Sequence, residues 1–256
     1  MRYLEISPSA DLAQDIQCYW ELAGNDVLGE PIFPDGRVEI VVHLGARPRV
    51  VGEVYPQPEV MVVGQMTRAL RLHQTTGLHA VGIRFTPTGA RKWLGAPLDE
   101  CTDGIHDLDG IAGRTAAGLR AAVHRGGRLD LSVSALEAAL RRSGTTRWSS
   151  SPAVEQAVKH ALASHGQVRV EALARSVGVG VRQLERQFLE TVGLSPKRFL
   201  KTARFQRALL LLRHGLAPAA VAGACGFSDQ SHLAREFRRV AGATVREIEL
   251  GRVAFL

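Results

Sequence analysis

Residues 221–237 read VAGACGFSDQSHLAREF, which has the pattern of a helix, a tight turn and a second helix. We expect the first helix over residues 217–225, a turn at the sequence GFSD, and the second helix over residues 230–240. Leu233 and Phe237 are four residues apart and fall on one face of that second helix. This arrangement predicts a helix-turn-helix unit, whose second helix reads the major groove of DNA.

The same pattern occurs earlier in the chain, with helices expected over residues 170–177 and 181–192 around the turn sequence GVG. The triplet Leu184-x-Arg186-x-Phe188 recurs in the later unit, and two copies at one helical phase are far less probable by chance than one. A connecting helix is expected over residues 195–213, which is about 28 Å at 1.5 Å per residue. Successive major-groove faces lie about 34 Å apart, so one chain could place two helices in neighbouring grooves.

Charge is divided unequally along the 256 residues. Residues 1–150 contain 16 Lys and Arg against 17 Asp and Glu, whereas residues 151–256 contain 16 against 8. The excess positive charge therefore lies in the C-terminal part, which favours a polyanionic partner for that part alone.

The cysteines, the N-terminal segment and the apolar runs indicate the cellular compartment. The three cysteines, Cys18, Cys101 and Cys225, form no C-x-x-C pair and predict neither a disulfide framework nor a zinc finger. The first residues carry charges without an apolar core, and no run of about 18 apolar residues occurs. We therefore expect a cytoplasmic protein with no membrane partner.

The fold class expected is α+β. Residues 1–142 are expected to form a small β-rich, barrel-like domain with helices, because short runs rich in Val, Ile and Thr alternate with Gly, Pro and Asp clusters. Polar residues at 143–152 predict a linker, and residues 153–250 predict an all-α domain of two helix-turn-helix units joined by a long helix. Strands are expected at 38–44, 60–63, 70–75 and 78–85, and helices at 87–94, 107–125, 132–142 and 152–164.

Residues 154–250 resemble the DNA-binding domain of the AraC/XylS family of bacterial transcription regulators. The motifs that carry the resemblance are Leu173-Ala174-x-x-Val177-Gly178-Val179, Leu184-x-Arg186-x-Phe188, Gly193-Leu194-Ser195-Pro196, Arg204-x-x-x-Ala208-x-x-Leu211-Leu212 and Val221-Ala222-x-x-x-Gly226-Phe227-Ser228-Asp229-Gln230-Ser231-His232-Leu233-x-Arg235-x-Phe237. The resemblance implies an activator or repressor that binds double-stranded promoter DNA, with RNA polymerase and a second copy of the chain as further partners.

The resemblance also implies which residues contact DNA. The residues expected to read bases are Arg182, Glu185 and Arg186 in the first unit and Gln230, Ser231 and Arg235 in the second. Arginine pairs with guanine, glutamine with adenine, and glutamate accepts from cytosine. Phosphate contacts are expected from Lys197, Arg198, Arg238 and Arg239, which add affinity without sequence information.

Two positions depart from the family pattern. The Ser or Thr that usually caps the first recognition helix is Gly180, so that helix is expected to start less firmly. The usual Gly-x-Thr-Pro near the end is Gly242-Ala243-Thr244-Val245, so the last helix is expected to be placed differently.

Residues 1–142 resemble the β-rich N-terminal domain of a poorly characterised subset of the family. The motifs are Tyr19-Trp20, Pro34-Asp35-Gly36-x-x-Glu39, Gly64-Gln65-x-Thr67-Arg68 and Gly82-Ile83-Arg84-Phe85-x-Pro87-x-Gly89-Ala90. In many members this domain binds a small-molecule effector and mediates dimerisation, and the effector here is unknown. The residues expected to contact it are Trp20, Glu39, Arg68 and Arg84; a turn role is the simpler account of Asp35.

No catalytic residue, metal site or cofactor is expected. His43, His73 and His79 lack the close H-x-H pair and following Glu of a cupin-like metal site, and no catalytic triad, phosphate loop or dinucleotide fingerprint occurs. Two alternatives stay open at this point. One is a metal- or ligand-dependent enzyme domain fused to a DNA-targeting domain, and the other is an N-terminal domain that binds only another protein or its own copy.

Overall fold

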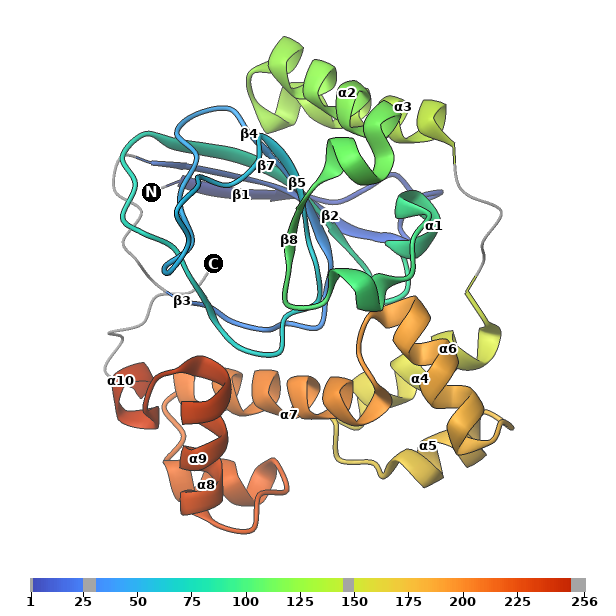
Figure 1. Ribbon diagram of the computed structural model, residues 1–256. Coiled ribbons are helices and arrows are strands. Elements are labelled where there is room, and N and C mark those ends of the chain that lie inside the picture. Colours follow the sequence, from blue (N-terminus) through green and yellow to red (C-terminus); the bar gives the residue numbers. More distant parts are fainter. Residues whose placement is uncertain (1, 25–30, 145–149, 250–256) are drawn as a thin grey trace.

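The N-terminal part is built on an antiparallel sheet. The structure, a computed structural model, describes residues 2–24, 31–144 and 150–249. Six strands pair in the order β1-β2-β7-β4-β5-β8, and a separate ribbon pairs β3 with β6 (Figure 1). The strands of the sheet are β1 (Arg2–Ile6), β2 (Ile16–Gly24), β4 (Glu39–His43), β5 (Val60–Val63), β7 (Leu78–Phe85) and β8 (Ile105–Asp107), and those of the ribbon are β3 (Pro31–Ile32) and β6 (Leu70–Arg71).

These strands match the sequence-based expectations only in part. Strands β5 and β7 have the expected bounds, and β4 lies within its expected range, but β6 ends at Arg71 rather than continuing to residue 75. Strands β1, β2, β3 and β8 were not predicted. Strand β2 is buried on both sides, so it lacks the polar alternation that identifies a half-exposed strand. Among the described strands, β1 and β8 remain edges, so the sheet is open rather than closed into a barrel.

Helices cover one face of this sheet (Figure 1). The helices of this part are α1 (Arg91–Leu94), the 3-10 helix η1 (Leu98–Cys101), α2 (Leu108–Gly126) and α3 (Leu129–Ser143). Tyr19, Ile40 and Ile83 from the sheet are buried with Leu119 and Leu136 from α2 and α3 in one hydrophobic core. The first helix is shorter than expected, since it begins at Arg91 rather than at residue 87.

A buried carboxylate fastens α3 to the sheet. The side chain of Glu21 on β2 is 1% exposed. It lies 2.8 Å from Arg2 Nη2 and 2.9 Å from His79 Nε2, and it accepts from the Leu129 amide at 3.2 Å. The amide bond matters because the N-cap residue of α3, Arg128, makes no side-chain cap. Burial alone would raise the pKa of Glu21, but the Leu129, His79 and Arg2 contacts outweigh it and lower the pKa.

Replacing Glu21 with Gln is expected to lower the free energy of unfolding by about 1.5–3 kcal/mol near pH 7, because hydrogen bonds to a buried charged group are lost. The folded pKa lies below the ordinary value of 4.5. The stabilisation is therefore complete above that value and is lost as pH falls through the folded pKa. Urea unfolding of both proteins across this range should show a shrinking difference. Glu53→Gln, at an exposed position, is the control; a difference independent of pH would contradict the role of the charge.

The C-terminal part is entirely helical over the described residues. Its helices are α4 (Pro152–Ala163), α5 (Val170–Ser176), α6 (Val181–Val192), α7 (Pro196–Arg213), α8 (Pro218–Ala224), α9 (Gln230–Ala241) and α10 (Val245–Glu249). The expected bounds of the helix pairs hold to within one residue at each end, and those of α6 hold fully. Residues 145–149 of the expected linker lie outside the described residues, and no described helix has the length and apolarity to cross a membrane.

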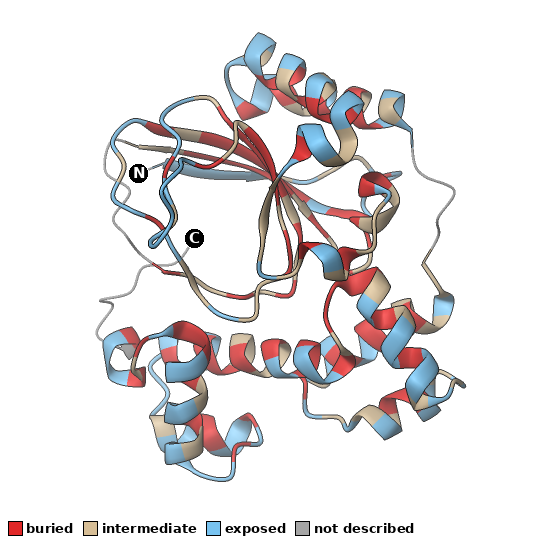
Figure 2. Ribbon diagram, viewed as in Figure 1, coloured by how far each residue is buried: buried red, intermediate tan, exposed pale blue. Residues whose placement is uncertain are grey.

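Each helix-turn-helix unit has its own core, and α7 connects them. Leu173, Leu184 and Phe188 are buried in the first unit, and Leu233 and Phe237 in the second. Figure 2 shows the buried positions facing inward along both units, with exposed positions on their outer surfaces. Helix α7 runs beneath the N-terminal part, with α5 and α6 near its start and α8 and α9 near its end (Figure 1).

Candidate functional site

Helix α6 presents the first candidate DNA-reading surface. Leu184 is fully buried, whereas Arg182, Glu185 and Arg186 are all exposed. The spacing of three and four residues places these side chains on one face of the helix, opposite the buried face. Lys197 at the start of α7 is also exposed, as is its neighbour Arg198.

Helix α9 presents the second surface in the same way. The candidate residues Gln230, Ser231, Arg235, Arg238 and Arg239 are all exposed. The Asp229 side chain caps α9 by accepting from the His232 amide at 2.7 Å. Because the cap fixes the first turn, it also fixes the direction of the residues at the start of the helix. Arg239 pairs with Glu236 at 2.5 Å.

Helix α6 lacks an equivalent cap. Its N-cap residue is Gly180, which has an extended backbone (φ −70°, ψ 151°) and makes no side-chain bond. A Cβ atom at this position would meet nothing within 4 Å. Gly180→Ser is therefore expected to raise the free energy of unfolding by a few tenths of a kcal/mol and to slow hydrogen exchange at the Arg182 and Gln183 amides. Gly180→Ala, which adds a Cβ without a cap, should weaken the helix; the reverse order would contradict the prediction.

The N-terminal part contacts the C-terminal ends of both recognition helices. At the end of α6, the Thr102 hydroxyl donates to the Gly193 carbonyl at 2.5 Å, and Arg91 pairs with Glu190 at 3.1 Å. At the end of α9, the Ala69 amide donates to the Val240 carbonyl at 2.7 Å.

The connecting helix is held as well. Gln206 on α7 donates to the Pro34 carbonyl at 2.5 Å. The Phe33 ring packs on Phe205 of α7 at a centroid distance of 5.8 Å. Helix α1, the segment after η1 and the loops beside the β3–β6 ribbon therefore touch all three elements that set the relative placement of the two recognition helices.

A cavity of about 200 Å³ lies between the sheet face not covered by α2 and α3 and helix α7. The strand register explains its composition, because side chains paired across the strands stand in rows on one face. The middle row contains Trp20, Gly82, Val41 and Met61. A Cβ at position 82 would lie 2.0 Å from the Trp20 ring, so only glycine allows the indole to lie there.

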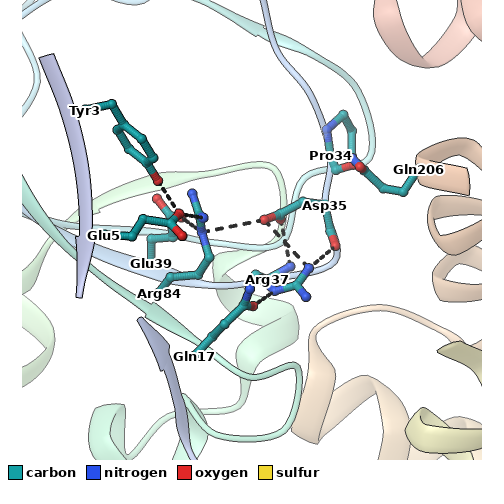
Figure 3. A network of polar contacts seen from close by, with 9 residues as sticks. All are labelled: Tyr3, Glu5, Gln17, Pro34, Asp35, Arg37, Glu39, Arg84 and Gln206. Carbon is teal, nitrogen blue, oxygen red and sulfur yellow. Dashed lines mark hydrogen bonds and ion pairs between the residues drawn. The ribbon is translucent and has the colours of Figure 1, made fainter. Parts of the chain in front are cut away.

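One end of the cavity is a charged network (Figure 3). Arg84 on β7 donates to Glu39 on β4 at 2.6 Å and to Glu5 on β1 at 2.9 Å, and it lies 3.9 Å from Asp35. Burial raises the pKa of the Glu39 carboxyl, and the Arg84 guanidinium opposes that effect. The Arg37 amide donates to the Asp35 carboxylate at 3.0 Å, which is the turn role expected for Asp35, although its side chain also lines the cavity.

The other end is polar but uncharged. His43 Nε2 lies 3.1 Å from Gln57 Oε1, and both side chains are buried. Burial lowers the pKa of His43 to about 4, so the ring is neutral near pH 7. His43 Nδ1 and Trp20 Nε1 are buried without a hydrogen-bond partner among the described residues. An unpaired buried group of this kind costs about 1–3 kcal/mol.

Of the four residues expected from the sequence to contact an effector, three line the cavity and one does not. Trp20, Glu39 and Arg84 line the cavity. Arg68 is exposed and is not among the lining residues. The α7 wall, formed by Gln206, Leu209 and Arg213, was not predicted from the sequence. The alternation of Glu39, Val41 and His43 on one face of a strand could be predicted from the sequence. The element that lies across the cavity from this face could not.

The histidines and cysteines do not assemble into a reactive centre in the described part of the chain. His43 faces the cavity, His79 pairs with Glu21, and His73 is exposed. Within the described residues, no group of three metal-ligand side chains occurs. Cys18, like the other two cysteines, is buried, and burial raises the pKa of its thiol to about 11.

Comparison with known proteins gives a match for each part of the chain. A family described as "Helix-turn-helix domain" matches residues 173–249, and a family described as "Domain of unknown function (DUF6597)" matches residues 4–107. The HTH-type transcriptional activator RhaS of Escherichia coli is 38% identical over 91 residues, which are 35% of this chain and 33% of the relative. The chain thus spans about a third of the length of the curated relatives it matches.

Solved structures of similar proteins include an AraC-type DNA-binding domain-containing regulator from Chromobacterium violaceum, which is 31% identical, covers 40% of this chain and 92% of that chain, and has a TM-score of 0.37. Another is an apo ToxT variant from Vibrio cholerae, which is 12% identical over 91% of this chain and 97% of that chain, with a TM-score of 0.46. The AraC family consists of transcription regulators and is not a family of enzymes. By the two family matches, residues 173–249 carry a helix-turn-helix domain of the kind found in AraC-family transcription regulators, and residues 4–107 carry a DUF6597 domain.

Proposed function

We propose that this protein is a cytoplasmic, effector-responsive regulator that reads two neighbouring major-groove segments of promoter DNA. In this proposal residues 1–142 sense the effector, residues 143–152 link, and residues 153–250 bind DNA. The observation that carries it is the pair of exposed, arginine-bearing helices α6 and α9 near the two ends of α7. Helix α7 has 18 residues, which is about 27 Å at 1.5 Å per residue and comparable with the major-groove repeat.

The proposed base contacts are Arg182, Glu185 and Arg186 from α6, and Gln230, Ser231 and Arg235 from α9. Their side chains offer the donors and acceptors that major-groove edges distinguish. Lys197, Arg198, Arg238 and Arg239 are proposed as phosphate contacts, which set affinity and its dependence on salt.

The proposed effector site is the cavity between the sheet and α7. The segment of residues 64–70 supports this assignment, since Gly64, Met66 and Leu70 line the cavity. Within that segment, the Ala69 amide bonds to the end of α9. Binding of a ligand in the cavity would therefore shift the segment of residues 64–70, whose backbone bonds to the end of α9. It would also contact α7 directly through Leu209.

Selection of bound duplexes from a random DNA pool by the full-length protein tests the proposal. Two enriched blocks about one helical turn apart support bipartite reading. One enriched block would restrict base reading to a single helix, and no enrichment at any salt concentration would refute sequence-specific binding by the effector-free protein. Transcription from the selected site with purified RNA polymerase then distinguishes activation from repression, and sedimentation on the duplex tests whether two copies bind together.

A further inference from the structure

We propose that the cavity takes a small, uncharged and largely apolar molecule that carries a hydrogen-bond acceptor, and that helix α7 forms one wall of the binding site. This inference rests on the proposed effector response and specifies its ligand class.

Size and lining limit the ligand first. A cavity of 150 Å³ with apolar walls binds benzene, so about 200 Å³ accommodates a single ring with a short substituent. The floor is apolar in its middle row, where Trp20, Val41 and Met61 face the space, and Leu22 and Ala80 continue it in the next row. Such a lining favours an apolar body.

The charged end argues against a charged ligand. Arg84 already bonds to Glu39 and Glu5, and Arg37 bonds to Asp35 and Gln17 (Figure 3). The cluster contains three carboxylates and two guanidinium groups. Arg84 bonds to two of the carboxylates, and the Arg37 guanidinium donates to the Asp35 carbonyl and lies 4.0 Å from the Asp35 carboxylate. An anionic ligand would be repelled by the carboxylates, which stay bound to Arg84. A cationic ligand would have to break the existing ion pairs before it could bind a carboxylate.

The unpaired polar atoms specify the functional group. Trp20 is 8% exposed, lines the cavity, and has an indole N–H with no acceptor among the described residues. An indole nitrogen is a donor only, so the ligand atom that satisfies it must be an acceptor. A carbonyl or ether oxygen on an apolar frame meets this requirement.

Helix α7 closes the site from the opposite side. Leu209 is buried and lines the cavity together with Gln206, whose side chain also bonds to the Pro34 carbonyl. A ligand on the sheet therefore contacts the helix that joins the two DNA-reading units. Ligand binding therefore affects α7 by direct contact and does not depend on the linker between the two parts of the chain.

Binding of three matched probes to the full-length protein tests this inference. Acetophenone has the ring and an acceptor, ethylbenzene has the same shape without the acceptor, and benzoate adds a charge. The readout is the ¹H–¹⁵N resonance of the Trp20 indole, assigned by comparison with Trp20→Phe. Acetophenone should shift this resonance saturably and bind roughly 3–10-fold more tightly than ethylbenzene, the value of one hydrogen bond. Benzoate should bind more weakly than both.

Variants on the two walls complete the test. Ala80→Leu fills the cavity from the sheet and Leu209→Phe fills it from α7, so each should abolish acetophenone binding, whereas Ala46→Leu at an exposed position should not. Binding that survives Leu209→Phe would refute the α7 wall, even if Ala80→Leu failed to fold. Tighter binding of benzoate, or no shift with any probe, would overturn the ligand class. If no probe binds as expected but a DNA motif is still selected, the ligand class is wrong and the proposed DNA-binding function stands. If the probes bind as expected but no DNA motif is selected, the ligand class stands and the proposed DNA-binding function is refuted.

Discussion

Replacing both Arg186 and Arg235 with alanine is expected to weaken binding to the selected duplex by about 2–6 kcal/mol. Each arginine, if it makes a bidentate contact with guanine, contributes about 1–3 kcal/mol of discrimination. The two lie on separate helices, α6 and α9, so their effects should add. Fluorescence anisotropy with the selected duplex and with single-base variants would measure both the loss and its position.

The single variants locate the contacts. Arg186→Ala should relax preference at one base position in one block, and Arg235→Ala at one position in the other. The control is Arg125→Ala with Arg142→Ala, which removes the same charge from exposed positions on α2 and α3. An equal loss on every duplex, with a shallower salt dependence, would assign both arginines to phosphate.

Truncating Phe205 to alanine is expected to lower the free energy of unfolding by about 3–5 kcal/mol, because a fully buried aromatic side chain leaves a cavity. The Phe205 ring lies 4.8 Å from the Phe237 ring in α9 and 5.8 Å from the Phe33 ring. It therefore belongs at once to the core of the second helix-turn-helix unit and to its contact with the N-terminal part.

Chemical denaturation of the full-length protein, followed by hydrogen exchange, would measure this effect. Exchange should accelerate first in α8 and α9 and less in α5 and α6, whose core is separate. Leu210→Ala, on the same helix but 45% exposed, is the matched control and should change stability by less than about 1 kcal/mol. A uniform increase of exchange in both units would indicate that they unfold together, against the two-core arrangement.

The helix-turn-helix units could be predicted closely because their determinants are local. Apolar residues at helical spacing, the turn glycines Gly178 and Gly226 with positive φ, and the Asp229 cap act within a few residues of one another. The prediction was weakest for β1 and β2. Strand β1 is an edge strand with mostly exposed residues, and β2 is buried on both sides, so neither shows a half-buried alternation.

By itself, the sequence determined two units with buried Leu-x-x-x-Phe faces and exposed arginines, because helical periodicity fixes which side chains share a face. It also placed Glu39 and Arg84 on strands. Only the tertiary structure paired them at 2.6 Å, laid Trp20 over Gly82, and set Leu209 of α7 as the opposite wall. These contacts join residues far apart in the chain, and they depend on strand register and on docking between parts of the molecule, which no local pattern encodes.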